Sequence, residues 1–182
     1  MSNLTTWSVD PSHTHIEFAV RHLMISTVKG RFAEFSGTVQ MDPADLTTAQ
    51  LKVAIDVASL DTRVADRDNH LRSADFFDVA TYPSLTYVSR RVEKDGDDYR
   101  IVGDLTIRGV TREIPLAVSL EGQAKDPWGN QRMAFAATTK INRADFGLTW
   151  NAALEAGGVV VGEEVRISID VELIAAAARV AA

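Results

Sequence analysis

Along most of this chain, apolar and polar residues alternate with a period of two, which is the pattern of β-strands that bury one face. The alternation is cleanest over residues 165–173, where each apolar residue is followed by a charged or hydroxyl-bearing one. About eight one-sided strands are expected from this pattern. Nine segments carry it, of which the first is short: residues 6–10, 13–22, 28–42, 51–57, 84–94, 99–107, 114–120, 133–141 and 165–173.

Short polar turns join these segments, so successive strands are predicted to be antiparallel neighbours. Residues 95–98 are typical of a hairpin turn, and residues 108–112 form another turn. Residues 42–48 and 126–130 are predicted loops. One-sided strands need a common interior, and closing the sheet removes its exposed edges. The pattern therefore predicts an all-β fold, an antiparallel up-and-down barrel of about eight strands, with a β-sandwich as the alternative.

Two phenylalanines indicate an irregularity within residues 28–42. Phe32 and Phe35 differ in parity, so a regular strand would place one of the two rings outside the barrel. A β-bulge near Ala33 and Glu34 would turn both rings inward, and we expect one there.

Residues 66–78 depart from the alternation. Asp66 or Asp68 can cap a short helix, because a carboxylate at that place accepts hydrogen bonds from the free backbone N–H groups of the first turn. Phe76 and Phe77 close the stretch, and a proline soon afterwards prevents the helix from continuing. We interpret the segment as a short helical lid whose two rings cover one mouth of the barrel. The alternative is an ordinary helical connection whose rings fill the core.

The interior of an eight-stranded barrel is either filled by side chains or hollow enough for one small ligand. The inward faces are rich in Phe, Ile, Leu and Val, but they also carry Gly103 and Ala137, where a solid core would hold larger side chains. A dry apolar tunnel favours a long hydrocarbon guest, whose burial would contribute roughly 10 kcal/mol before entropic costs. The sequence leaves two possibilities, a lipid tunnel or a packed barrel that serves as an interaction module.

Composition and charge narrow the class of protein. The 182 residues fit a single domain, with a core over about residues 7–173 and a frayed tail over 175–182. A net charge of −6 without a basic stripe opposes a nucleic-acid partner. No apolar run is long enough to span a membrane, and the N-terminus lacks an export signal. We therefore expect a cytoplasmic protein, periplasmic only if a signal has been removed.

Candidate catalytic chemistry is sparse. The absence of cysteine excludes disulfides and thiolate metal sites, and neither a nucleophile elbow nor a phosphate loop is present. His13 and His15, two residues apart on a strand, would point the same way and could begin a zinc or iron site with Glu17. A metal-dependent enzyme built on them is the alternative function. The main prediction is a binding protein without catalytic residues, metal or cofactor.

Several stretches together resemble the YceI-like family of lipid-binding proteins over residues 7–173. The residues that carry this resemblance are Asp10 to His22 (DPSHTHIEFAVRH), Gly30-Arg31-Phe32 with Phe35-Ser36-Gly37, Arg67 to Asp78 (RDNHLRSADFFD) with Tyr82-Pro83, Leu105 to Thr111 (LTIRGVT), and Gly162 to Val165 (GEEV).

The resemblance implies a lipocalin-like antiparallel β-barrel that holds a polyisoprenoid chain, such as a prenyl quinone or prenyl phosphate, as a carrier or storage protein. Family members are often dimers, so the resemblance implies a possible homodimer. Many members are exported to the periplasm, whereas this chain shows no signal peptide. The family offers no settled catalytic residues.

Strand parity predicts which residues contact such a guest. Phe76 and Phe77 would cover one mouth, and Phe146 and Trp150, in a second irregular stretch over residues 143–150, would lie near an opening. His22 and His70 would either meet the polar head group or form hydrogen bonds within the protein. The complete predicted ligand-binding set is Phe18, Val20, His22, Phe32, Phe35, His70, Leu71, Phe76, Phe77, Leu105, Ile107, Phe135, Phe146 and Trp150.

Overall fold

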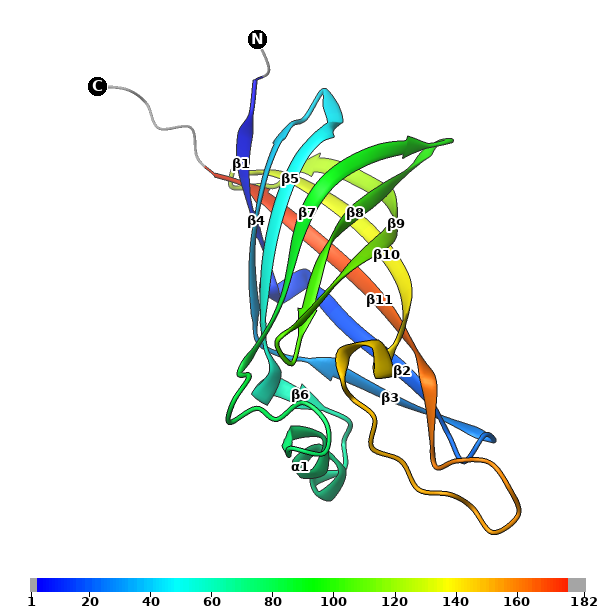
Figure 1. Cartoon of the computed structure of the whole chain (residues 1–182). Helices are drawn as coiled ribbons and strands as arrows, with labels where there is room; N and C mark the ends of the chain where they lie inside the picture. Colours follow the sequence, from blue (N-terminus) through cyan, green and yellow to red (C-terminus); the bar gives the residue numbers. More distant parts are fainter. Residues whose placement is uncertain (1–2, 177–182) are drawn as a thin grey trace.

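The computed structural model describes residues 3–176, in which an antiparallel β-barrel stands above a single short α-helix (Figure 1). The helix is α1 (Ala65–Arg72), and three short 3-10 turns are η1 (Pro11–His13), η2 (Val57–Ser59) and η3 (Arg143–Phe146). The strands are β1 (Thr5–Val9), β2 (His15–His22), β3 (Ser26–Phe32), β4 (Phe35–Asp42), β5 (Asp45–Asp56), β6 (Leu60–Asp61), β7 (Ser84–Asp95), β8 (Asp98–Ile107), β9 (Val110–Lys125), β10 (Gln131–Asn142) and β11 (Val161–Ala175).

The barrel closes through β11, which pairs with β10 on one side and with both β1 and β2 on the other. β1 and β2 follow one bent path interrupted by η1, and β3 and β4 follow a second one, since β2 pairs with β3 and β1 pairs with β4. Counted in this way the barrel has eight antiparallel strands. The predicted fold class, including the single short helix, is confirmed.

The corner between β3 and β4 corrects the predicted β-bulge. Instead, the strand is interrupted at Ala33 and Glu34. The segments on either side of this corner, β3 and β4, pair with different strands. The hydroxyl of Ser59, in η2, accepts hydrogen bonds from both backbone N–H groups at the corner, at 3.1 and 2.9 Å. A side chain distant in sequence therefore provides a hydrogen-bond acceptor for the backbone N–H groups of the corner. Both Phe32 and Phe35 still face inward.

Three further expectations about the strands were wrong. The loop predicted over residues 42–48 is a tight turn, because β5 already begins at Asp45, which pairs with Asp42. His13 belongs to η1 rather than to a strand. Ala175 is not part of a tail but pairs with Trp7, at the end of β11. The remainder of the predicted tail, residues 177–182, lies outside the described residues.

Helix α1 is held by polar contacts and has no apolar face of its own. Neither Asp66 nor Asp68 caps it, since the cap residue is Val64, whose side chain makes no capping hydrogen bond. Asp68 is buried, and it accepts hydrogen bonds from the backbone N–H of Thr62 at 2.9 Å and from the Thr62 hydroxyl at 2.5 Å. The carboxylate thus fixes the preceding loop to the helix, and the predicted cap is wrong.

Apolar side chains form two clusters inside the barrel. The larger one extends from the middle of the barrel to the α1 end, and it includes Phe76 and Phe146. The smaller one, with Trp7 and Met41, lies at the opposite end. Among the three tryptophans, Trp7 is buried, Trp150 lies beside α1, and Trp128 is 82% exposed in the β9–β10 loop.

Candidate ligand-binding cavity

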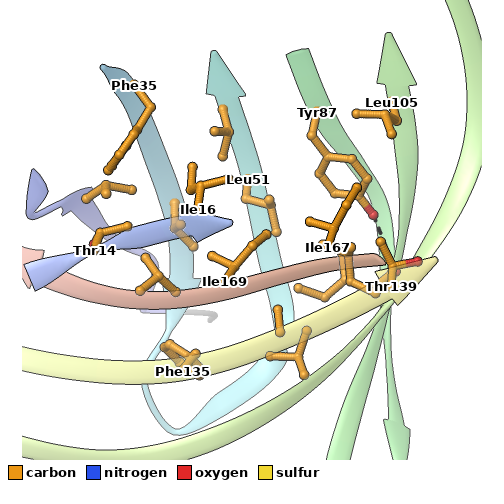
Figure 2. A pocket seen from close by; sticks show the side chains of 18 of the residues that line it. Thr14, Ile16, Phe35, Leu51, Tyr87, Leu105, Phe135, Thr139, Ile167 and Ile169 are labelled. Carbon is orange, nitrogen blue, oxygen red and sulfur yellow. Dashed lines mark hydrogen bonds between the residues drawn. The ribbon is translucent and has the colours of Figure 1, made fainter. Parts of the chain in front are cut away.

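The inward faces of the barrel enclose a cavity of about 200 Å³ that runs along its interior. Figure 2 shows side chains from β2, β4, β5, β7, β10 and β11 converging on this space. Two hydroxyls in the wall are engaged with the protein: that of Tyr87 donates to the carbonyl of Ile114 at 2.9 Å, and that of Thr139 donates to the carbonyl of Pro115 at 2.7 Å. The cavity therefore presents an almost entirely apolar surface.

Two glycines let aromatic rings lie flat against the wall. A Cβ on Gly30 would overlap the ring of Phe18, and a Cβ on Gly103 would lie 2.6 Å from Cζ of Tyr87. Each ring covers a glycine on the neighbouring strand instead of filling the interior. The bulk that Gly103 lacks is thus supplied by Tyr87, whereas Ala137 borders the cavity directly.

Six residues of the predicted ligand-binding set line this cavity. They are Phe18, Phe32, Phe35, Leu105, Ile107 and Phe135. Val20 does not, although its parity is the same as that of Phe18. Val20 lies further along β2, where it is half-buried between Val28 and Val165 beyond the end of the cavity.

The remaining predicted residues are outside the cavity wall. His22 ends β2, where it pairs with Ser26 and Val161. Leu71, on α1, and Phe77 are half-buried against the main apolar cluster. Phe77 reaches the cavity through its edge-on contact with Phe32, whose ring centroid lies 6.1 Å away.

Rings and one imidazole form a closing layer between the cavity and α1. The ring of His70 lies edge-on to Trp150 at 4.6 Å and to Phe76 at 5.1 Å, measured between centroids. Its Nε2 is 2.8 Å from a carboxylate oxygen of Asp75, so the imidazole is engaged within the protein. Phe146 is buried in η3 at the same end.

Two arginines that the sequence pattern did not single out hold this layer. Arg108 donates to the carbonyls of Phe76 and Gly147, both at 3.1 Å, and so ties the lid segment to η3. Arg143 is buried and donates to the carbonyls of Leu148 and Trp150. Burial lowers the pKa of Arg143 from its ordinary value. Both follow the end of a strand. Arg108 lies within the LTIRGVT stretch that carries the family resemblance, but that pattern does not indicate its contacts with the lid, and Arg143 belongs to no such stretch.

An ionic network lies at the other end of the barrel. Arg132 donates to Asp126 at 2.8 Å and to Asp10 at 2.9 Å, and it also contacts Glu172. Nδ1 of His13 lies 2.9 Å from Asp10. This contact lowers the pKa of Asp10 most, burial opposes it, and Arg132 lowers the pKa further, to about 2. The network joins β1, β10 and β11.

The alternative metal site does not form as predicted. Among residues 3–176, the cluster of potential ligands with suitable spacing is Asp10, His13 and Glu172, and His15 is not part of it. The guanidinium of Arg132 contacts both carboxylates of that cluster. A fixed cation already neutralises the site, which opposes binding of a second, divalent one.

The helix in the described part of the chain is too short and too polar to cross a bilayer.

Comparisons with known proteins agree with the barrel geometry. The family model described as "YceI-like domain" matches residues 7–173. Protein YceI of Escherichia coli is 44% identical over 136 residues, which cover 75% of this chain and 71% of that protein. The crystal structure of the Campylobacter jejuni YceI protein is 35% identical with a TM-score of 0.73, covering 85% of this chain and 88% of the other.

A second similar solved structure carries a functional description. It is a polyisoprenoid-binding domain from Saccharophagus degradans implicated in plant cell wall breakdown, with a TM-score of 0.69 over 94% of this chain and 99% of that chain. At 17% identity the likeness is one of fold.

Proposed function

This chain belongs to the YceI-like family, and on that premise we propose that its barrel binds the hydrocarbon chain of an isoprenoid lipid. The observation that carries the proposal is the apolar cavity inside the closed sheet. At roughly 24 cal/mol per Å³, leaving about 200 Å³ empty costs about 5 kcal/mol of folding free energy. A hydrocarbon guest would recover that cost, because it supplies the missing contacts without requiring polar partners.

The guest of this proposal is a prenyl quinone or a prenyl phosphate, and the protein acts as its carrier or store. The name of the Saccharophagus degradans neighbour supports the isoprenoid class. The proposal assigns binding rather than catalysis, because the cavity surface is almost entirely apolar and the hydroxyls of Tyr87 and Thr139 in its wall are hydrogen-bonded to backbone carbonyls. A homodimer and a cytoplasmic location, both expected from the sequence, belong to the same proposal, and light scattering and cell fractionation test them.

Mass spectrometry of an organic extract of the native protein tests the ligand class. We expect a prenyl lipid in the extract, and we expect prenyl quinones to bind the stripped protein in titration. Changing Ala137→Trp, which faces the cavity, should abolish binding by occupying the space. Changing Thr138→Trp, on the exposed face of the same strand, is the matched control. A lipid-free native protein that also refuses prenyl quinones would refute the proposal.

The metal-dependent alternative has its own measurement. Elemental analysis that finds stoichiometric zinc or iron, lost on changing His13→Ala or His15→Ala, would favour an enzyme over a lipid carrier. The packed interaction module is disfavoured by the cavity itself, since the inward side chains do not fill the barrel.

A further inference from the structure

Two of the seams between neighbouring strands are only half closed. β5 and β7 pair from Asp56 and Ser84 as far as Lys52 and Val88, after which the two strands diverge (Figure 1). β9 and β10 pair as far as Ala117 and Thr138, and the rest of β10 has no partner in β9. The first gap is in the half of the barrel away from α1, and the second faces α1.

The β9–β10 gap is filled by the protein. The hydroxyl of Thr139 bonds to the carbonyl of Pro115 across it, at 2.7 Å. The next element, η3, packs against both strands and places the side chain of Phe146, only 1% exposed, at this end of the barrel. The β9–β10 gap is therefore closed by η3.

Among residues 3–176, no element covers the β5–β7 gap in the same way. Residues 45–51 and 89–95 both remain strands, each paired on its other side, yet they share no ladder. A bulge between Ser89 and Arg91 turns β7 away from β5. The Ser89 hydroxyl accepts from the backbone N–H of Leu51 at 2.9 Å, which satisfies the first amide beyond the ladder. In the described chain, Figure 1 shows no helix or loop crossing this gap.

The two sides of this gap are continuous with the cavity. Leu46, Ala49 and Leu51 on the β5 side line the cavity, as does Val92 on β7. On β8, behind β7, Tyr99 and Ile101 line it too. An apolar surface thus extends from the interior to the edges of the two strands where they share no ladder. A hydrocarbon chain passing there would meet apolar side chains from both strands, beside strand-edge backbone groups of which the Leu51 N–H is bonded by Ser89.

We propose that the β5–β7 gap is a lateral portal, through which the hydrocarbon chain of the guest passes between a lipid bilayer and the cavity. The inference rests on the proposed function and adds a route to it. The lid end is closed by the layer around Phe76 and Trp150, and η3 closes the β9–β10 gap, whereas no element within residues 3–176 covers the β5–β7 gap in this way. Lipid exchange then depends on the separation of β5 and β7.

Cross-linking the portal after folding tests this route. Because the chain has no cysteine, only introduced thiols react. Gln50→Cys with Arg90→Cys places exposed thiols on β5 and β7 at the gap, where a flexible bis-maleimide can join them. Transfer of dansyl-labelled geranylgeraniol from phosphatidylcholine vesicles is followed by dansyl fluorescence. Linking should slow transfer by roughly tenfold or more, because the gate can no longer open.

Two cross-linked controls separate the portal from general stiffening. Arg100→Cys with Ala117→Cys joins β8 to β9 where the ladder is complete, and it should leave the rate unchanged. Glu113→Cys with Lys140→Cys joins the strands beside the filled β9–β10 gap, and it too should leave the rate unchanged. Transfer at the unlinked rate after closing the β5–β7 gap would overturn the portal. Failure of the parent protein to take up the prenol would instead count against the proposed function.

Discussion

At the scale of single residues, the hollow interior depends on pairs of a glycine and a ring on adjacent strands. The sequence indicated that Gly103 was too small for a solid core, but it could not indicate that Tyr87 would cover it. That contact depends on the register between β7 and β8. Parity placed Phe18 and Leu105 correctly toward the interior, but it failed for Val20, because parity gives the face of a strand and not the position along the barrel.

Changing Gly103→Ala should narrow the cavity. The new Cβ would lie 2.6 Å from both the Tyr87 ring and the carbonyl oxygen of Val88, so the ring must move inward and the β7 backbone must shift as well. We expect a loss of about 1–3 kcal/mol in the free energy of unfolding, as for overpacked cores, with weaker prenol binding. Urea denaturation and titration measure the two effects. Gly122→Ala is the control, since its Cβ would meet nothing within 4 Å; equal losses in both variants would contradict the role of Tyr87.

Asp10 should make stability depend on acid pH. Its pKa falls from 3.8 to about 2 on folding, so the folded state favours the carboxylate. The stabilisation is complete above the unfolded pKa and is lost as the pH falls from about 4 through about 2. Asp10→Asn should therefore be less stable at neutral pH, with a smaller fall in unfolding free energy over that window. Asp97→Asn, in an exposed turn, is the control; parallel pH curves for Asp10→Asn and the parent would contradict the assignment.

At the scale of elements, α1 shows that tertiary contacts can override local preferences for helix capping. Acidic residues at the start of a helix are typical caps, yet Asp68 is turned toward Thr62. Arg72, at the other end of α1, donates to the carbonyls of Ala58 and Leu60. The helix is thus anchored to η2 and β6 by polar groups. The phenyl rings of the lid, Phe76 and Phe77, come from the segment after the helix.

Replacing both lid rings, Phe76→Asp and Phe77→Asp, should weaken retention of a bound lipid. Charges placed in this apolar layer must be desolvated or must open it to water. We expect faster release of a preloaded prenol, measured by dilution into empty vesicles, even when circular dichroism shows an intact barrel. Ile25→Asp, at a hairpin tip where the side chain is 78% exposed, should release lipid at the parental rate. Unchanged release from the double variant would remove the lid role.

At the scale of the whole molecule, the alternation predicted the closed antiparallel sheet but not the way it closes. Closure joins residues near both ends of the chain, such as Trp7 with Ala175, and no local pattern specifies such a pair. The corner at Ala33 was also hidden, because it is stabilised by Ser59, which is distant in sequence. The two half-closed seams were hidden as well, because the hydrogen-bonded ladders there are shorter than the strands, and the alternation predicts strands only.

A guest that fills the cavity should stabilise the entire barrel. Ligand that binds only the folded state raises the free energy of unfolding, by about 2.7 kcal/mol at a hundred times its dissociation constant. We expect geranylgeraniol to raise Tm of the stripped protein in calorimetry. The Ala137→Trp variant, whose cavity is occupied, should show no such rise. An increase of similar size in that variant would indicate binding elsewhere on the protein.

The placement of the three tryptophans gives this chain built-in optical reporters. The indole of Trp7 is enclosed at one end of the barrel, that of Trp150 stands in the layer at the other end, and that of Trp128 faces solvent. Iodide quenching will therefore act first on Trp128, and a Trp128→Phe protein keeps one emitter per end. Ligand occupancy, and transient opening of either end of the barrel, can then be followed by the tryptophan fluorescence of the protein itself, without attaching a dye.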